Sequence, residues 1–344
     1  MSNLPKLSYV LLTYNRERYI QSALESAFAQ EYDGELEYII SDDCSTDNTF
    51  KIIRDSVAEY KGNRKVIVIQ TPRNMHLAGN INYALKYASG DFVIRADDDD
   101  ISCRNRCALI GAAVQKYPNC SFVLGSWRAF SDREEMISKY QALNAYTSNK
   151  NFRVIDVGIT GDMSSEDWNY NHQAWSRKVY VEFGPLSEKL YFLEDYVALL
   201  RAVVLGNGVL TNSLFAYIRK GEAQMSTSNG MRDSLKVNDI IAHELAVSRA
   251  FIDAYHPLLL EFEALFRWVS TNCTEDRQKA LINYLSRERE KTHKTYLSAN
   301  HWKTPFVKRM WRALWQKNNK LFAIVRALPL PLYAIVISLA KRFR

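Results

Sequence analysis

The stretch GDFVIRADDDDIS, Gly90–Ser102, decides the fold that this sequence predicts. Its apolar and β-branched run Phe92–Ala96 is bounded by turn residues, which indicates a buried strand. Four acids, Asp97–Asp100, follow at once. Open α/β sheets bind ligands beyond the carboxyl ends of their strands, and four adjacent carboxylates repel one another unless water or a cation compensates them. The stretch therefore predicts a strand that ends in a ligand-binding turn, with a solvated acidic turn as the alternative.

Strand and helix patterns alternate on both sides of this stretch. Apolar runs predict strands at Ser8–Leu12, Leu36–Ile40, Lys65–Ile69, Ser121–Gly125 and Gly208–Ile218. One-face spacing predicts helices over 15–30, 80–88, 103–117, 172–183 and 191–205 and one capped by 45–47, whereas 131–170 looks irregular. Such alternation implies a parallel sheet with right-handed crossovers. We therefore expect the polar residues after the strands, namely Thr13–Asn15, Asp42–Asp43 and Asp97–Asp100, to converge on one edge.

The composition favours a globular protein with reduced thiols. The hydrophobic share of 47% is ordinary for a folded chain, and 344 residues suffice for one large or two smaller domains. Five cysteines form no CxxC pair and the six histidines show no ligand spacing, which disfavours a disulfide framework and a zinc site. The start MSNLPKLSYV has no secretory pattern, so we expect a cytoplasmic location.

The positive charge is concentrated at one end of the chain. The net charge is +7, but Lys291–Arg344 holds 12 Lys and Arg and no acid, which leaves −5 for residues 1–290. A nucleic-acid-binding domain would carry its positive charge along the working face. A basic tail on a mildly acidic body is instead typical of attachment to a membrane surface, and we expect no nucleic acid partner.

The tail pattern supports the same expectation. Apolar residues recur at helical spacing, with basic residues on the other faces: Phe306, Val307, Met310, Trp311, Leu314 and Trp315. The clean apolar stretch Ala327–Ala340 has 14 residues, short of the ~20 that span a bilayer. We therefore expect an in-plane attachment rather than a membrane-spanning helix. A helical subdomain packed on the body, or a basic face for a protein partner, is the alternative.

Motifs that would indicate other chemistry are missing. No GxGxxG follows the first strand and no GxxxxGK[ST] occurs, which disfavours a dehydrogenase or P-loop enzyme. An EF-hand that starts at Asp97 fails because its sixth position is Ser102 and its twelfth is Ala108. Several carboxylates without histidine favour Mg²⁺ or Mn²⁺, which usually bind one or two carboxylates and a phosphate group. A substrate that contains a diphosphate is therefore expected.

Five stretches carry a family resemblance over roughly residues 8–220. They are SYVLLTYNRERYIQSALESAFAQ (8–30), EYIISDDCSTDNT (37–49), GDFVIRADDDDIS (90–102), FGPL (183–186) and FLEDYVALLRA (192–202). In this order and spacing the chain resembles the family 2 glycosyltransferases with a GT-A fold. The resemblance implies a Rossmann-like, mixed but mostly parallel sheet flanked by helices. It also implies a nucleotide-sugar donor, a divalent cation and an inverting displacement.

The resemblance also assigns roles to residues. Asp195 matches the general base, with its neighbour Glu194 as the alternative, and the acids Asp97 and Asp99 match the metal-binding DxD pair. The expected donor contacts are Thr13, Tyr14, Asn15, Asp42, Asp43, Asn82, Asp97, Asp98 and Arg219. Arg219, or Lys220 beside it in a mobile loop, would replace an arginine that many relatives carry before the DxD strand. Acceptor contacts are expected from His172, Trp175 and Trp168, with core packing as the alternative for each tryptophan.

These expectations add up to one function. A single sugar would move from a UDP-, dTDP- or GDP-sugar to a glycan acceptor, since the QxxRW element of processive synthases is absent. The tail suggests a polyprenyl-diphosphate-linked oligosaccharide of O-antigen or capsule type, at the cytoplasmic face of the inner membrane. We expect a catalytic domain over 1–230 (halves 1–126 and 127–230), a helical extension over 231–300 and membrane-associating helices over 301–344. A metal-dependent nucleotidyl or phosphoryl transferase and a non-catalytic scaffold are the alternatives.

Overall fold

A computed structural model describes residues 4–143, 151–163, 172–190, 193–220 and 237–299. The chain divides into two compact units, one of 1–220 with 260–286 and another of 221–259 with 287–344. The domain boundary expected near residue 230 falls within 221–236, outside the described residues, and stays a prediction.

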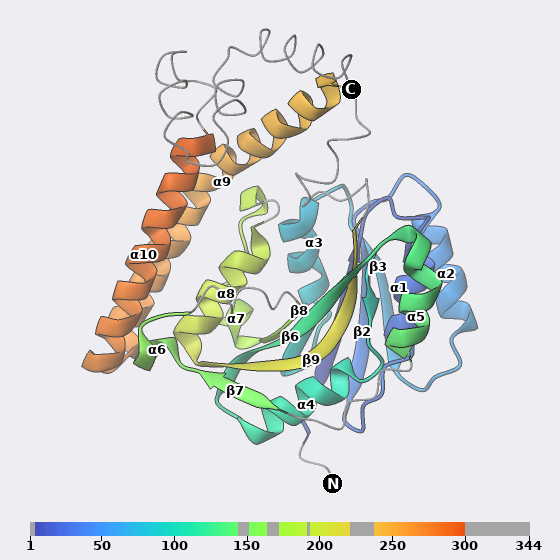
Figure 1. The fold of residues 1–344 in the computed structure, drawn as a ribbon, viewed down its shortest axis with the longest axis horizontal. Helices are drawn as coiled ribbons and strands as arrows, with labels where there is room; N and C mark the ends of the chain where they lie inside the picture. The colour runs from blue at the N-terminus through green and yellow to red at the C-terminus, as the bar shows by residue number, and fades with distance from the viewer. Residues whose placement is uncertain (1–3, 144–150, 164–171, 191–192, 221–236, 300–344) are drawn as a thin grey trace. The chain divides into compact units, whose positions relative to one another are not determined.

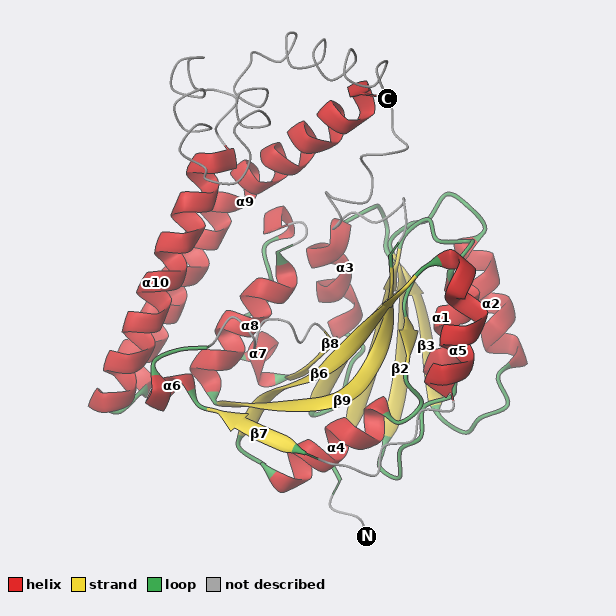
Figure 2. Cartoon of the chain, viewed as in Figure 1, coloured by secondary structure: helices red, strands yellow, loops and turns green. Residues whose placement is uncertain are grey.

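A mixed nine-stranded sheet forms the centre of the first unit in its described part (Figures 1 and 2). Its strands are β1 (Leu7–Thr13), β2 (Leu36–Asp42), β3 (Lys65–Gln70), β4 (Phe92–Asp97), β5 (Ile101–Ser102), β6 (Cys120–Phe130), β7 (Phe152–Ile155), β8 (His172–Ser176) and β9 (Asn207–Arg219). The order is β3-β2-β1-β4-β8-β6-β9-β5, with β7 also paired to β9. Strands β3, β2, β1 and β4 are parallel, and β8 runs antiparallel between β4 and β6. The expected mixed sheet is confirmed.

Helices flank this sheet, as expected. They are α1 (Ile20–Phe28), α2 (Thr49–Glu59), α3 (His76–Leu85), α4 (Arg106–Lys116), α5 (Glu135–Leu143), α6 (Val157–Thr160), α7 (Lys178–Val181) and α8 (Glu194–Leu205), with short 3₁₀ turns η1 (Asp132–Glu134) and η3 (Glu188–Leu190). Alternate residues of β1 point to opposite faces of the sheet. Leu7, Tyr9 and Leu11 therefore pack in one core with the apolar sides of α1, α2 and α4. That core fixes where each parallel strand ends.

The long helices α9 (Val237–Asn272) and α10 (Glu275–Ala299) contribute to both units. In the first unit, Arg201 of α8 makes a paired ion contact of 2.8 Å with Glu261 of α9. In the second unit, the ring of Tyr255 stacks on Tyr296 with centroids 3.9 Å apart. No helix in the described ranges is long and apolar enough to cross a bilayer. The expected membrane-associating tail, 301–344, lies outside those ranges.

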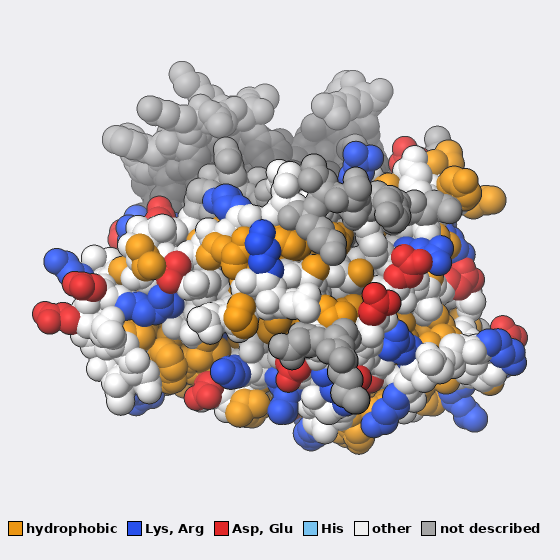
Figure 3. Space-filling view, turned by 90° about the horizontal axis from the view of Figure 1, so that it is seen from below, with side chains coloured by type: hydrophobic (Ala, Val, Ile, Leu, Met, Phe, Trp, Pro, Cys, Tyr) orange, Lys and Arg blue, Asp and Glu red, His pale blue; other side chains and the backbone are white. Residues whose placement is uncertain are grey.

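The face seen in Figure 3 carries both signs of charge. Lysine and arginine side chains are interspersed there with aspartate and glutamate, and orange apolar side chains lie between them. Interspersed charges of this kind keep a surface soluble without creating a strong field of one sign.

Three local expectations need correction. The first helix begins at Ile20 rather than at 15, because Asn15 has a left-handed φ of 51° that a helix cannot include. The helix expected over 172–183 is strand β8 followed by the short α7. Strand β8 is buried on both faces from Gln173 to Ser176, so it lacks the alternation by which strands are recognised. Finally, α5, β7 and α6 order much of the stretch 131–170 that looked irregular.

A buried carboxylate ties the amino ends of three elements together, opposite the site described below. Glu37 of β2 accepts hydrogen bonds from Ser8 Oγ of β1 at 2.7 Å and from Ser89 N at 2.6 Å. Ser8 Oγ in turn accepts from Gly90 N at 2.7 Å. Gly90 is required here because a Cβ would lie 2.5 Å from Ser8 N. Burial alone would raise the pKa of Glu37, but the hydrogen bonds from Ser8 and Ser89 together lower it.

We predict that Glu37→Gln destabilises the fold by about 2 kcal/mol at pH 7, the scale of a lost charge-assisted hydrogen bond. A lowered pKa means that the stabilisation is present above the unfolded value and is lost as the pH falls. The difference in the free energy of unfolding between wild type and variant should therefore be smaller at pH 4 than at pH 7. Urea unfolding at both pH values measures it. Glu35→Gln, at the exposed carboxylate that pairs with Lys6, is the matched control; equal effects of the two variants would contradict the prediction.

Candidate active site

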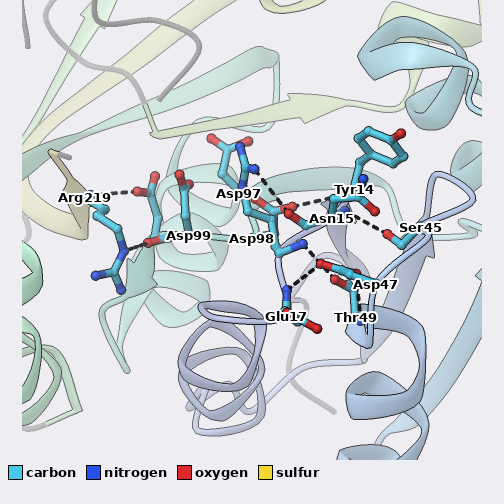
Figure 4. A network of polar contacts seen from close by, with 12 residues as sticks. Tyr14, Asn15, Glu17, Ser45, Asp47, Thr49, Asp97, Asp98, Asp99 and Arg219 are labelled. Carbon is cyan, nitrogen blue, oxygen red and sulfur yellow. Dashed lines mark hydrogen bonds and ion pairs between the residues drawn. The ribbon is translucent and has the colours of Figure 1, made fainter. Parts of the chain in front are cut away.

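The loops after β1, β2 and β4 meet at the carboxyl edge of the sheet, as the sequence predicts (Figure 4). Tyr14 N donates to Asp98 Oδ2 at 3.1 Å, which joins the first loop to the acidic turn. Asn15 N donates to Ser45 Oγ, and the Asn15 side chain accepts from Thr46 N, both at 2.8 Å. These reciprocal bonds fasten the first loop to the second. One polar edge is thereby assembled from segments that lie far apart in sequence.

Backbone strain gathers at the same edge. Asn15, Cys44 and His76 have left-handed φ values of 51°, 61° and 58°. Non-glycine residues in this region cost free energy, and such strain clusters where loops are held for binding. Asn is among the non-glycine residues most often found in this conformation, and the Asn15 side chain is held there by the Thr46 backbone, 31 residues away.

The acids after β2 are deeply buried. Asp42 accepts from Ser45 N at 3.0 Å and from Gln70 Nε2 at 2.8 Å. Asp43 accepts from Thr71 Oγ1 at 2.9 Å and from Met75 N at 2.8 Å, and burial raises its pKa. Asp43 thus anchors the loop before α3 rather than facing the edge. Gln70 was not expected from the sequence, although its place as the last residue of β3 could have indicated it.

The four consecutive aspartates have different contacts. Asp98, 13% exposed, bonds Tyr14 N and lies 3.4 Å from Arg16 Nε, whereas Asp97 is 36% exposed and accepts from Arg95 at 2.8 Å. Buried Asp100 accepts from Arg219 N at 2.9 Å. The Asp99 carboxylate accepts from its own backbone N–H, and no hydrogen bond or ion pair joins it to another residue within the described ranges. Asp97 and Asp99 are therefore the acids that could take a further ligand.

Burial, and after it the charges of neighbouring acids, raises the pKa of Asp98, Asp99 and Asp100. Burial, and next the charge of Asp99, raises the pKa of Asp98 to about 7. Burial, with the charge of Asp97, also raises the pKa of Asp99, and Asp100 lies well above the usual range. A bound cation would offset this repulsion. No group of three or more potential ligand side chains occurs in the described part of the chain, so a cation here would complete its shell with substrate and water oxygens.

Arg219 does not lie in a mobile loop, contrary to expectation. It ends β9, and its Nε donates to Asp99 O at 3.0 Å (Figure 4). Its Nη1 lies 2.7 Å from Asp132 and 3.1 Å from Glu135, and the guanidinium covers the ring of Tyr19 at 4.3 Å. Because the Arg219 guanidinium is buried and paired with acids, it holds the acidic turn in place and does not face a donor phosphate. Its neighbour Lys220 lies over the ring of Trp127.

The expected base lies at the start of α8. Glu194 is 3% exposed and 3.2 Å from Arg95, and burial raises its pKa to about 8. Asp195 is half-buried and accepts from Tyr196 N at 2.7 Å. Burial raises the pKa of Asp195 as well, with Arg95 acting in the opposite direction. Of the two acids, Asp195 is the one with surface for an acceptor hydroxyl.

Other expected contacts lie elsewhere. The Asn82 amide exchanges two hydrogen bonds with the Leu186 backbone, at 2.7 and 2.9 Å, so it holds the FGPL loop rather than a donor. Trp175 is fully buried against Phe122 and has no surface for an acceptor, so that expectation is wrong and the core alternative is right. Trp168 lies outside the described residues, and for His172 only the backbone, in β8, is described.

Comparison with known proteins now adds to this geometry. Residues 8–166 match the family model Glycosyl transferase family 2. The chain is 30% identical over 153 residues to UDP-Glc:alpha-D-GlcNAc-diphosphoundecaprenol beta-1,3-glucosyltransferase WfgD of Escherichia coli, a match over 44% of this chain and 57% of that protein. The matched segments span 41%, 57% and 61% of the lengths of the first three curated relatives.

Two solved structures share the fold. The crystal structure of TarS from S. aureus matches with a TM-score of 0.57 at 17% identity, over 95% of this chain and 50% of that one. The mannosyltransferase PcManGT from Pyrobaculum calidifontis, in complex with GDP-Man and Mn²⁺, matches with a TM-score of 0.50 at 15% identity, over 99% of this chain and 81% of that one. At these identities the likeness concerns the fold alone.

Proposed function

Since residues 8–166 match the model of glycosyl transferase family 2, we propose that this chain is a member of that family and transfers a single sugar with inversion, in a metal-dependent reaction, to a glycan hydroxyl. One observation carries the proposal. Two acids with ligand capacity, Asp97 and Asp99, and a half-buried acid at the start of α8, Asp195, lie around the same arginine-lined edge. Members of the family use nucleotide-sugar donors, and this edge has the parts that such a transfer needs.

A divalent cation fits the acidic turn. Asp97 and Asp99 would hold it, because Asp98 and Asp100 already bond the backbone N–H groups of Tyr14 and Arg219. Mg²⁺ and Mn²⁺ accept two carboxylates and complete their shells with phosphate and water. When bound, the cation neutralises charge on the departing nucleoside diphosphate. The complex of PcManGT with GDP-Man and Mn²⁺ supports this choice of ions.

The first two loops would bind the donor nucleotide. Tyr14 is exposed at the edge, beside Asn15, and the exposed side chain of Gln70, held by the buried carboxylate of Asp42, lies at the end of β3. Thr13 ends β1 in the same row. These groups suit a nucleoside of a UDP-, dTDP- or GDP-sugar.

Asp195 would take the proton from the attacking hydroxyl. A single carboxylate that activates the acceptor, opposite the leaving group, gives direct displacement and hence inversion. Glu194 is the weaker candidate because its carboxylate is buried against Arg95.

The acceptor we propose is a polyprenyl-diphosphate-linked oligosaccharide, used in assembly of a surface polysaccharide at the cytoplasmic face of the inner membrane. Two observations support it. The relative WfgD is named for a diphosphoundecaprenol acceptor, and the basic, aromatic pattern of 306–315 suits an anionic membrane surface.

Asp99→Asn should abolish protection by donor in the presence of Mn²⁺. A donor at 100 times its dissociation constant stabilises the wild type by about 2.7 kcal/mol, and loss of a cation ligand removes most of this. Thermal unfolding with a panel of UDP-, dTDP- and GDP-sugars, with and without Mn²⁺, measures it. Asp55→Asn, at an exposed acid of α2, should behave like wild type. Full Mn²⁺-dependent protection of Asp99→Asn would refute the cation assignment.

Asp195→Asn should lower kcat by about 10²- to 10⁴-fold, the contribution of a general base. Donor protection should persist, since the cation site is intact. Transfer needs ionised Asp195, and burial raises the pKa of this acid. As the pH is lowered, the wild-type rate should therefore begin to fall at a higher pH than it would with a fully exposed aspartate as the base. Product analysis and pH–rate profiles test this, with Glu182→Gln as an exposed control. Unchanged turnover would remove the base assignment, and release of nucleoside monophosphate with pyrophosphate would select a nucleotidyl transferase.

The full chain should sediment with vesicles that contain anionic lipid. Replacing Lys308, Arg309 and Arg312 by Gln should weaken this binding roughly a hundredfold, at about 1 kcal/mol for each basic residue. Raised salt should weaken wild-type binding in the same way. Wild-type protein that stays in the supernatant would contradict the membrane proposal while leaving the transfer reaction open to its own tests.

A further inference from the structure

One guanidinium group contacts both halves of the candidate site. Arg95 Nη2 donates to Asp97 Oδ1 at 2.8 Å and lies 3.2 Å from Glu194 Oε1. The side chain is 16% exposed. The acid that would bind the cation and the helix turn that carries the base are therefore joined through a single residue.

The strand geometry explains why Arg95 can reach both acids. Residues i and i+2 of a strand point to the same face, so Arg95 and Asp97 of β4 lie side by side. The backbone at Arg95 is itself held, because Arg106 Nη2 donates to Arg95 O at 2.7 Å. Arg106 is fully buried and also donates to Ser102 Oγ at 3.0 Å. The Arg95 side chain thus extends from a backbone position that Arg106 holds in place.

The first turn of α8 depends on this contact. Leu193 at the N-cap offers no side-chain bond to the helix. Both carboxylate oxygens of Glu194 are buried and accept no hydrogen bond within the described ranges. Asp195 accepts from the backbone N–H of its neighbour Tyr196. The ion pair between Glu194 and Arg95 therefore ties this turn to β4.

We propose that Arg95 is a positioning residue that sets the separation between the cation-binding acids and Asp195. This inference rests on the proposed function. The cation holds the leaving group and the base holds the attacking hydroxyl, so their separation decides whether attack is in line. Both carboxylates contact the same nitrogen, Nη2, whose N–H groups have fixed directions in the guanidinium plane, whereas the N–H groups of a lysine ammonium rotate freely. A displacement of about 1 Å in such a site costs about 10²-fold in rate.

A simpler role makes different predictions. If Arg95 only neutralised the buried Glu194, removal of both charges would restore both folding and activity. The double variant Arg95→Met/Glu194→Gln, compared with Glu194→Gln alone, separates the two roles. Arg95→Lys keeps the positive charge but lacks the planar guanidinium. Arg277→Met, which removes an arginine–carboxylate pair with Asp156 elsewhere in the first unit, is the matched control.

We expect Arg95→Met/Glu194→Gln to unfold near the temperature of Glu194→Gln, because no buried charge is left unpaired. Its kcat should still fall about 10²-fold below that of Glu194→Gln, with donor KM little changed. Arg95→Lys should recover part of kcat. Arg277→Met should lower the unfolding temperature without changing kcat. A double variant with the kcat of Glu194→Gln, or a loss confined to donor KM, would overturn the proposal.

Hydrogen exchange of the backbone amides tests how firmly the first turn of α8 is held, and it does not require catalytic activity. Amides 196–199 of the double variant should exchange faster than those of Glu194→Gln, and unchanged exchange would overturn the proposal. If the wild type transfers no sugar from any donor of the panel, the proposed function fails. The exchange result still decides whether Arg95 fixes α8.

Discussion

The compensation of negative charge at the carboxyl edge of the sheet is the constraint on which this structure depends. Asp97–Asp100, Glu194 and Asp195 lie close together and partly out of water. Carboxylates in such surroundings either take up protons or need cations. Positive charge comes from Arg16 in the loop after β1, from Arg95 in β4 and from Arg219 at the end of β9. Asp97 and Asp99 remain with the greatest capacity for a further ligand, and a divalent ion bound to a donor diphosphate would complete the balance.

The same contacts explain why the loops are held so firmly. Hydrogen bonds join the first and second loops, in which Asn15 and Cys44 have left-handed conformations. The cost is met because the strands beneath are locked by an apolar core on one side and by Glu37 at the other end of the sheet. Rigid loops at this edge suit binding of a nucleotide, since little order remains to be gained when the donor arrives.

Neighbouring acids of the same type have different contacts in this site. The four consecutive aspartates differ in partners, so one fastens the first loop, one accepts from the β9 backbone and two could bind a cation. Glu194 and Asp195 are neighbours, yet one is buried against Arg95 and the other is open to an acceptor. Neighbouring residues on a helix point about 100° apart. Glu194 is therefore buried while Asp195, the next residue, is accessible.

The sequence by itself determined the alternation of strands and helices, the ends of β1, β2 and β4 to within two residues, and the family resemblance. Those features are local, because periodicity and turn residues act over a few positions. Only the tertiary structure decided that Arg219 holds the acidic turn, that Asn82 holds Leu186 and that Trp175 is core. The partners of these residues lie far along the chain: Asn82 and Leu186 are 104 residues apart, and Arg219 and Asp100 are 119 residues apart. A hydrogen bond across such a distance exists only once the sheet has brought its strand ends together, so no local pattern could reveal it.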